Sequence, residues 1–401
     1  MNLFLSTLIF INFSLITNTP SSSTDEELMQ KAKELSQKIL IIDTHIDVPY
    51  RLEEKYEDIS ERTAGGDFDF VRAKTGGLDV PFISVYVPAE EESKKNAKNV
   101  ANGLIDMVEG FATKWPDKFQ IVSSTKDVLN NAFNGKVLLA MGIENGAPIE
   151  GDLKNLRHFY NRGIRYITLC HSKSNHISDS SYDEVRKWNG LSPFGKELVS
   201  EMNKTGMMID VSHISDLAFY DVMEITEVPV IASHSSCRHF TPGWERNMDD
   251  DMIKKLGENG GVIQINFGSS FLDGDIKSNR EKSWSKVKKF AAENKISTSD
   301  PRAAEFRKQY MIENPHFADI SDVVKHINHA VKLAGIDHVG LGSDFDGVGD
   351  SLPEGLKDVS YYPNLIFQLL KAGYSELDIE KICGGNLMRV WKANEEYAAK
   401  Q

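Results

Sequence analysis

A histidine and two aspartates directly follow an apolar run near the start of the chain. The aliphatic residues 39–42 lead into Asp43, His45 and Asp47. Four consecutive aliphatic residues indicate a strand that is buried on both faces, as in a parallel sheet. Because side chains alternate along a strand, His45 and Asp47 would point the same way, and an imidazole beside a carboxylate can bind a divalent metal. A single pair of this kind is also common as an ordinary structural contact. Whether His45 and Asp47 bind a metal therefore depends on what the rest of the sequence contains.

Five later apolar runs end in residues of the same chemical kinds. The runs over residues 137–144, 165–171, 207–213, 230–234 and 339–344 end, respectively, at Glu144, His171, His213, His234 and Asp344. Two further runs, over 80–87 and 261–267, lack such an ending, although Asn266 stands near the end of the second. Each run has the length of a buried strand, so most of the predicted strands end in residues that bind metals or transfer protons.

Helical patterns separate these strands along the chain. Apolar residues at helical spacing occur over 26–39, 91–115, 195–202, 216–225 and 249–258. Strands that alternate with helices predict a parallel sheet, and about eight strands in 401 residues favour a closed (β/α)8 TIM-type barrel over an open doubly wound sheet. No Gly-x-Gly-x-x-Gly follows the first strand, which disfavours a dinucleotide-binding fold. We predict one α/β domain over residues 24–401.

A charged stretch at about 275–315 interrupts the alternation of strands and helices. It is rich in Lys, Arg and Glu and contains helix-like runs at 283–294 and 300–313. Because active-site loops of a barrel follow the strand ends, we predict a helical insertion near the barrel mouth. A solvated surface hairpin is an equally good interpretation of its composition.

The fold prediction turns the separate strand ends into one site. All strands of a parallel barrel end on the same face, so residues far apart in the sequence converge there. Three widely spaced cysteines, Cys170, Cys237 and Cys383, give neither a disulfide framework nor a Cys-x-x-Cys zinc site. We therefore predict a metal site built from histidines and carboxylates at the strand ends.

The remaining histidines do not end apolar strands. His326 and His329 flank the apolar stripe of a helix around residues 320–331, and we predict that they form a solvated pair. His176 and His239 lie in loops just after strand ends, so they could only support the site from outside the ligand set.

The net charge and the two ends of the chain limit its partners and its location. A formal charge of −13 argues against a nucleic-acid partner that is bound through its phosphates. The apolar run 3–16, followed by polar residues 17–23, fits a secretory signal, so we predict a signal peptide and polar leader over 1–23 and an exported, periplasmic or extracellular protein. The last residues, 398–401, lack the hydrophobic tail of a lipid-anchor signal, so we expect no membrane anchor in the mature chain.

An ordered series of motifs between about residues 39 and 391 resembles the membrane (renal) dipeptidase family. The motifs are Asp43-Thr44-His45-Ile46-Asp47, Gly142-Ile143-Glu144-Asn145-Gly146, Thr168-Leu169-Cys170-His171-Ser172, Asp210-Val211-Ser212-His213, Ser233-His234-Ser235-Ser236, Arg246-Asn247 and Gly342-Ser343-Asp344-Phe345-Asp346-Gly347. Animal members carry cysteine bridges and a lipid-anchor tail, and this chain has no such tail and too few cysteines. It looks closer to the bacterial branch of the family.

The resemblance implies an amidohydrolase-type barrel with two zinc ions, and it suggests a homodimer. His45 and Asp47 would bind one ion, and Glu144 would bridge the two. His213 and His234 would complete the second zinc site. Two neighbouring metals lower the pKa of a shared water and polarise a carbonyl group, which suits hydrolysis of a peptide bond.

The resemblance also assigns three residues to the substrate. His171 would contact the scissile carbonyl oxygen, and Arg246 would bind the C-terminal carboxylate of a dipeptide. Asp344 would contact the bridging water or the free amine and would pass a proton to the leaving amine. Asp43 lies one pleat deeper than His45 on the first strand, so we expect it to support the site without binding metal.

Three functional hypotheses remain at the level of the sequence. The first is a zinc-dependent dipeptidase for dipeptides with free amino and carboxyl ends, including those with a D-residue at the C-terminal side. The second is another binuclear amidohydrolase that acts on a lactone, lactam or cyclic amide. The third is an exported protein that binds metal or peptide without turnover, which the presence of both Asp344 and His171 disfavours.

Overall fold

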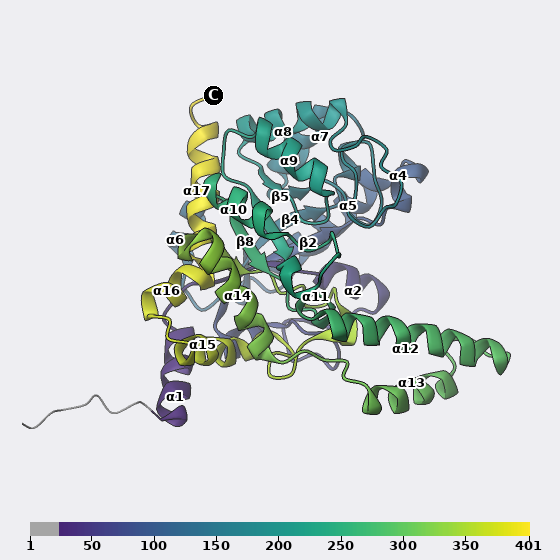
Figure 1. Cartoon of the computed structure of the whole chain (residues 1–401). Helices are drawn as coiled ribbons and strands as arrows, with labels where there is room; N and C mark the ends of the chain where they lie inside the picture. Colours follow the sequence, from purple (N-terminus) through teal and green to yellow (C-terminus); the bar gives the residue numbers. More distant parts are fainter. Residues whose placement is uncertain (1–23) are drawn as a thin grey trace, which may run out of the picture.

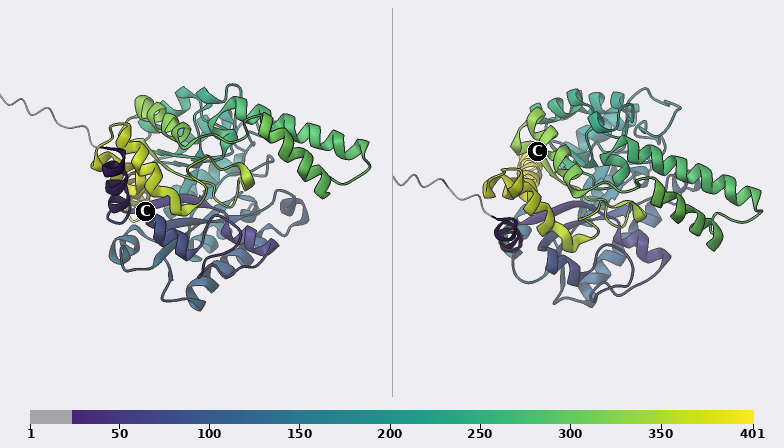
Figure 2. Two further views of the ribbon diagram at one scale, coloured as in Figure 1. Left: turned by 90° about the horizontal axis from the view of Figure 1, so that it is seen from below. Right: turned by 60° about the horizontal axis from the view of Figure 1, so that its bottom comes forward.

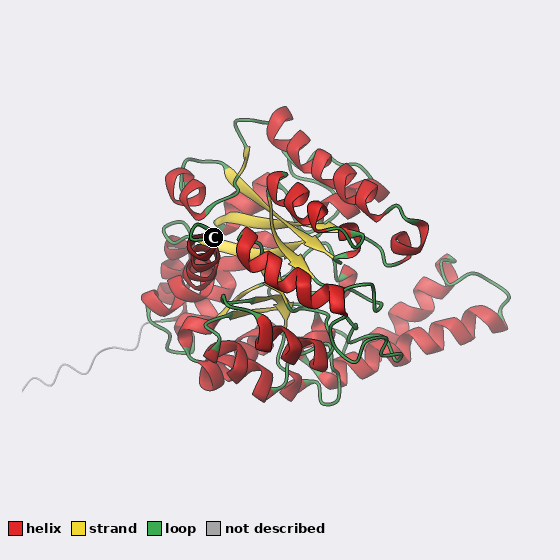
Figure 3. Cartoon of the chain, turned by 90° about the horizontal axis from the view of Figure 1, so that it is seen from above, coloured by secondary structure: helices red, strands yellow, loops and turns green. Residues whose placement is uncertain are grey.

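Parallel strands form a nearly closed barrel at the centre of the molecule (Figures 1 and 3). Around the barrel they are β1 (Ile41–Ile46), β2 (Leu78–Tyr86), β4 (Val137–Glu144), β5 (Ile164–Thr168), β6 (Met208–Asp210), β7 (Ile231–Ser235), β8 (Val262–Ile265) and β9 (Val339–Leu341). The short β3 (Phe119–Ile121) pairs with the first part of β4 and was not predicted. The predicted TIM-type barrel is confirmed.

This computed structural model describes residues 24–401. The predicted signal peptide and leader over 1–23 lie outside the described residues, so the exported location stays a prediction. Among the helices of residues 24–401, none combines the length and the apolar character that crossing a membrane requires.

The barrel closes between β1 and the segment that follows β9. The Asp47 backbone N–H donates to Phe345 O at 2.9 Å, and the Asp344 N–H donates to His45 O at 3.0 Å. The buried Asp43 carboxylate accepts from the backbone N–H groups of His45 and Ser343, both at 3.0 Å, and so joins the two sides of the seam. Asp43 therefore supports the strand end, as its deeper position on the strand predicts.

Helices surround the barrel and close one of its ends. They are α1 (Asp25–Ser36), α2 (Val48–Glu54), α3 (Phe70–Gly76), α4 (Glu90–Lys94), α5 (Ala97–Lys114), α6 (Thr125–Asn131), α7 (Leu153–Asn161), α8 (Pro193–Thr205), α9 (Asp216–Ile225), α10 (Asp250–Glu258), α11 (Ser269–Leu272), α14 (Ile320–Ala334), α15 (Tyr362–Lys371), α16 (Glu376–Glu380) and α17 (Asn386–Ala398). The helix predicted over 91–115 is divided into α4 and α5, because Lys95 adopts a left-handed backbone with φ 54° that ends α4.

Alternation along the strands divides the buried side chains into two layers. Ile42, Phe82 and Met208 belong to the cluster inside the barrel, whereas their neighbours on the strands pack against the outer helices. The interior cluster also contains Trp391 of α17, whose ring lies 5.2 Å from that of Phe82. Helix α17 thus fills one end of the barrel, and the polar strand ends occupy the other.

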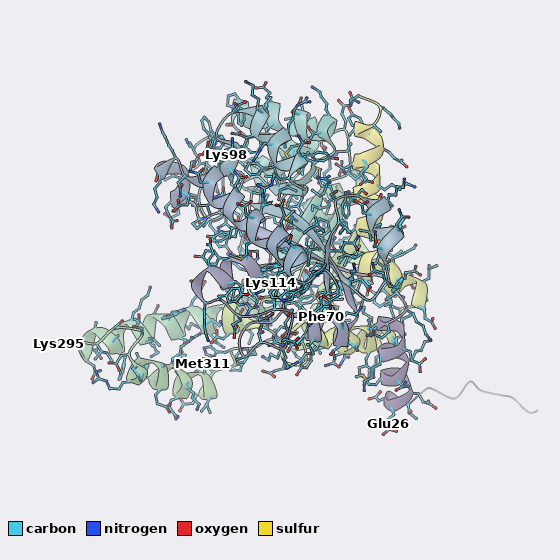
Figure 4. The ribbon with its side chains drawn as sticks, turned by 180° about the vertical axis from the view of Figure 1, so that it is seen from behind. Glu26, Phe70, Lys98, Lys114, Lys295 and Met311 are labelled. Atoms are coloured by element: carbon cyan, nitrogen blue, oxygen red, sulfur yellow. The ribbon has the colours of Figure 1, made fainter. Side chains whose placement is uncertain are left out.

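A helical hairpin of α12 (Gly274–Glu293) and α13 (Pro301–Glu313) projects from the barrel where the charged insertion was predicted (Figures 1 and 2). Figure 4 shows Lys295 at its far end and Met311 on its second helix. The rings of Phe290 and Phe306 stack with centroids 4.5 Å apart and hold the two helices together.

The prediction of a solvated histidine pair on α14 is wrong for His326. This side chain is fully buried, and its Nδ1 accepts from the backbone N–H of Cys237 while its Nε2 lies 2.9 Å from Leu272 O. The loop after β7 and helix α11 cover this part of α14, so a position on the flank of the apolar stripe is enclosed. His329 stays partly exposed and pairs with Asp250.

We predict that Gly142→Ala destabilises the barrel through Tyr166. A Cβ atom at Gly142 would lie 2.1 Å from the Tyr166 ring, whereas a Cβ at Gly110 on α5 would meet no atom within 4 Å. Overpacking of this kind costs about 1–3 kcal/mol, so the free energy of unfolding in urea should fall by that amount. Gly110→Ala, the matched control, should leave it unchanged or slightly raised. Equal stability of the two variants would contradict this account.

Candidate metal centre and active site

The carboxylate of Glu144 lies at the centre of the predicted site, between two sets of donor atoms. Its Oε2 faces His45 Nε2 at 3.5 Å, and its Oε1 faces His213 Nε2 at 3.1 Å and His234 Nε2 at 3.2 Å. His171 Nε2 lies 3.5 Å from the same Oε1. The structure thus brings together strand ends that are up to about 190 residues apart, and each carboxylate oxygen faces a different group.

The hydrogen bonds of Tyr166 determine which nitrogen of His45 carries its proton. The Tyr166 hydroxyl donates its one hydrogen to Thr44 O at 3.0 Å. His45 Nδ1 lies 2.9 Å from the same hydroxyl oxygen and must therefore donate to it. Nε2 is then unprotonated in the neutral ring, and it is buried without a hydrogen-bond partner in the described chain. A bare imidazole nitrogen aimed at a carboxylate is what a metal ligand requires.

A second chain of hydrogen bonds orients His234 in the same way. The Ser233 hydroxyl donates to Asp210 Oδ2 at 2.6 Å, so it can only accept from His234 Nδ1, which lies 2.8 Å away. Asp210 is held in turn by the backbone N–H groups of Ser212 and Ser233. The free Nε2 of His234 therefore points at Glu144 and lies 2.8 Å from His213 Nε2. Two nitrogen acceptors this close need a cation or a proton between them.

Burial and the surrounding charges shift the pKa values toward a metal-binding set. Burial lowers the pKa of His213 and His234 well below the usual range, and the Arg246 guanidinium lowers both further, so both rings are neutral. Burial opposes the charge on Glu144, yet the four imidazoles around it, His171 and His45 foremost, hold its pKa well below the usual value. The neutral His213 and His234 beside an ionised carboxylate match the donors that zinc-like ions prefer. His45 is shifted the other way: burial lowers its pKa, but Tyr166, Asp47 and Glu144 together raise it well above the usual range.

Asp47 and Asp344 complete one side of the centre. Asp47 Oδ2 lies 3.4 Å from His45 Nε2, and these two residues and Asp344 each place a donor atom within 4.8 Å of the others. Burial and the charges of Asp47 and Glu144 raise the pKa of Asp344 well above its usual value. The glycine at position 347 leaves room for the Asp344 carboxylate, because a Cβ there would lie 2.1 Å from Asp344 Oδ1.

Backbone strain also marks this site. His213 and Asp344 both have left-handed backbones, with φ of 70° and 64°, which residues other than glycine rarely adopt. Neither residue lies within its strand: β6 ends at Asp210 and β9 ends at Leu341, three residues earlier in each case. The prediction that His213 and Asp344 end their strands is therefore imprecise. Short turns after β6 and β9 carry the two residues into the site.

Of the three predicted substrate-binding residues, His171 and Asp344 line the cavity, whereas Arg246 does not. His171 lines the cavity above Glu144, where its distances suit either a metal ligand or a contact to substrate. Arg246 is 2% exposed, and its guanidinium donates to Ser235 Oγ at 2.9 Å and to His234 O at 2.7 Å. Its Nε is buried without a partner among the described residues. Arg246 thus lies behind the cavity wall with an unused donor.

A cavity of about 720 Å³ opens above the metal centre. Its lining includes Asp47, Glu144, His171, His213 and Asp344, and also aromatic and charged residues that the sequence motifs do not contain: Tyr50, Tyr86, Tyr182, Trp244, Phe271, Lys277, Arg280 and Trp284. The last three belong to α12, so the base of the hairpin forms part of the wall. Tyr86 ends β2, but the other residues lie on helices α2, α11 and α12 or in loops, where no strand-end pattern could identify them.

Comparison with known proteins identifies the family of this chain. The family model for membrane dipeptidase, peptidase family M19, matches residues 29–401. An uncharacterized dipeptidase of Schizosaccharomyces pombe is 33% identical over 391 residues, which cover 92% of this chain and 84% of that one. Dipeptidase tcpJ of Claviceps purpurea is 33% identical over 343 residues, which cover 84% of this chain and 71% of the relative.

Solved structures share the fold over nearly the whole chain. The probable dipeptidase PvdM of Pseudomonas aeruginosa aligns with a TM-score of 0.78 and 26% identity, over 93% of this chain and 100% of that one. A metallopeptidase of Rhodobacter sphaeroides, solved with a phosphinate mimic of the dipeptide L-Ala-D-Ala, aligns with a TM-score of 0.73 and 24% identity, over 89% and 99%. At 24% identity, the similarity to the Rhodobacter sphaeroides structure shows a shared fold alone.

We predict that Glu144→Gln removes most of the metal that the purified protein retains. The amide keeps the shape of the side chain but loses the charge that faces both donor groups. Metal content per chain after dialysis should be measured by atomic spectrometry, with the exposed Glu150→Gln as the control that keeps its metal. Because the surrounding imidazoles hold the pKa of Glu144 well below its usual value, the variant also loses these favourable contacts, so its melting temperature should be recorded alongside its metal content. Unchanged metal content would show that Glu144 does not hold the ions.

Proposed function

The chain belongs to the membrane dipeptidase family, and we propose that it uses two zinc ions to hydrolyse dipeptides with free amino and carboxyl ends. The coarser activity, that of a metallopeptidase acting on dipeptides, follows from the family. The observation that carries the finer proposal is the position of Glu144, whose two oxygens face separate groups of donors.

The donor set fits two zinc ions. His45 and Asp47 with Glu144 Oε2 would hold one, and His213 and His234 with Glu144 Oε1 would hold the other. Hydrogen bonds place the proton of each neutral ring on Nδ1, through Tyr166 for His45 and through Ser233 and Asp210 for His234. The Nε2 atom that faces the centre is therefore unprotonated. When bound, two such ions polarise a peptide carbonyl and make a shared water acidic.

Asp344 is the residue we propose for proton transfer. Burial and the nearby carboxylates raise its pKa well above the usual value, which favours a group that carries a proton, and the Asn266 amide donates to its Oδ2 at 2.7 Å and fixes the side chain. One oxygen therefore remains to take a proton from the attacking water and to give it to the leaving amine. His171, which lines the cavity beside Glu144, is placed to hydrogen-bond the scissile carbonyl oxygen.

Arg246 is the proposed partner of the substrate's C-terminal carboxylate. One of its N–H groups now points at His213 Nε2 at 3.1 Å, the atom that His213 would give to a metal. A metal-loaded centre would release that N–H, and the Nε of Arg246 has no partner in the described chain. The guanidinium could then offer two donors to a carboxylate once the wall side chains Trp244 and Phe271 make room.

We predict hydrolysis of dipeptides that depends on both free ends. The zinc-loaded protein should be assayed with L,L and L,D dipeptides by release of the free amino acids, and L-Ala-D-Ala belongs in the panel because a mimic of it binds the Rhodobacter sphaeroides relative. Blocking the substrate carboxylate as an amide should lower kcat/KM by about tenfold to a hundredfold, the value of a charged hydrogen bond. If no member of a broad panel is cleaved by protein with two zinc ions per chain, the proposal fails.

A second candidate is an amidohydrolase for an uncharged lactone, lactam or cyclic amide. The observation that favours it is the burial of Arg246, which does not line the cavity. Such an enzyme would need no carboxylate partner.

Arg246→Ala separates the two candidates. For a dipeptidase we predict a KM about tenfold to a hundredfold higher with a smaller change in kcat, whereas an enzyme for neutral substrates should respond little. Arg280→Ala is the control, since Arg280 lines the same cavity but pairs with Asp350. Metal content and melting temperature should be recorded for both variants, because Arg246 also bonds to the backbone of His234. Arg246→Lys, which keeps the charge, should restore part of the affinity.

A further inference from the structure

A second group of metal-ligating side chains lies outside the active-site cavity. His239 of the 3₁₀ turn η2 (Arg238–Phe240), Asp250 of α10 and His329 of α14 each place one donor atom within 4.8 Å of the others. None of the three lines the cavity above Glu144. Each comes from a different element, so the cluster is a product of the folded chain.

Contacts behind the cluster fix the elements that carry it. The backbone N–H of Cys237, at the start of the turn, donates to His326 Nδ1 at 3.0 Å, and the Phe240 ring lies 4.5 Å from that of His326. Both contacts bind the turn to α14. Asp250 is the first residue of α10, whose N-cap Asp249 accepts from the Met252 N–H. Little reorganisation is therefore needed to bring the donors together.

The donor side chains are close to each other and open to solvent. His329 Nε2 lies 2.7 Å from Asp250 Oδ1, and the rings of His329 and His239 stack with centroids 4.4 Å apart. The side chains of His329 and Asp250 are 15% and 42% exposed, and His239 is exposed. An ion can therefore reach the cluster directly from solution.

We propose that His239, Asp250 and His329 bind one divalent transition-metal ion of the zinc class. Two imidazoles and a carboxylate are donors that zinc, nickel and copper share, and three protein ligands leave a position for water. A tetrahedral ion held at about 2.1 Å by two donors separates them by about 3.4 Å. Binding would replace the hydrogen bond between His329 and Asp250 and widen that pair by less than an ångström.

The bound ion would link the loop after β7 to two helices. That loop, residues 236–248, carries Arg246, and it is bonded to α14 only through the turn at its start. An ion shared by the turn, α10 and α14 would add a connection on the outer side of the loop. It would therefore raise the melting temperature without taking part in the reaction.

The test is a zinc titration of the holoenzyme. Protein loaded at its active centre and freed of excess metal is titrated calorimetrically with zinc chloride, and its metal content is measured afterwards. The wild type should take up an additional ion per chain, with a rise in melting temperature. His329→Gln and Asp250→Asn should each weaken that uptake by about tenfold or more while dipeptidase activity stays unchanged. His158→Gln on α7 is the matched control, because His158 bonds to Asn102 away from the cluster.

Each outcome decides the proposal. An additional ion that is lost in both cluster variants and kept in His158→Gln supports it. No additional ion in the wild type shows that His329 and Asp250 form only a hydrogen-bonded pair. An additional ion that both cluster variants retain places it elsewhere and also overturns the proposal. None of these results depends on which substrate the active centre hydrolyses.

Discussion

The buried carboxylate of Glu144 imposes the main constraint on this fold. Burying a charge away from water is unfavourable unless partners compensate it. Four imidazoles from different parts of the chain surround the Glu144 carboxylate. Two of those imidazoles are held neutral, so they do not supply a full countercharge. A pair of divalent cations would supply it, and would also separate His213 and His234, whose Nε2 atoms face each other at 2.8 Å. The donor set thus suits the two ions that we propose, one beside each carboxylate oxygen of Glu144.

The residues behind the ligands explain why a closed barrel suits this centre. Tyr166 points into the interior from β5 and reaches His45 on β1, and Gly142 on β4 leaves the space for its ring. Asp210 at the end of β6 reaches Ser233 on β7, which orients His234. The link from β5 to β1 joins facing strands, so the orientation of His45 depends on the barrel being closed, whereas that of His234 depends on the pairing of β6 with β7. The bonds of Asp43 across the seam secure that closure.

Sequence patterns predicted the barrel and brought its polar strand ends together, because both follow from local alternation and from one geometric rule. They could not reveal Tyr166 as the partner of His45, since an inward tyrosine on a strand looks like any core residue. They misjudged His326, whose burial depends on the loop after β7 folding over α14. They also placed His171, His213 and Asp344 within strands that end earlier. For Tyr166 and His326 the missing information is a tertiary contact between distant segments.

The two clusters of potential metal ligands differ in whether the sequence alone can show that their residues converge. Ligands at strand ends converge because a parallel barrel always brings strand ends to one face, so their sequence pattern carries information about space. His239, Asp250 and His329 sit on a turn and two helices, where each residue also fits an ordinary solvated position. Their approach depends on how α10 packs beside α14, and side-chain packing of helices allows several crossing angles. The sequence gives the residue types of such a cluster, but only the folded structure shows that they lie close together.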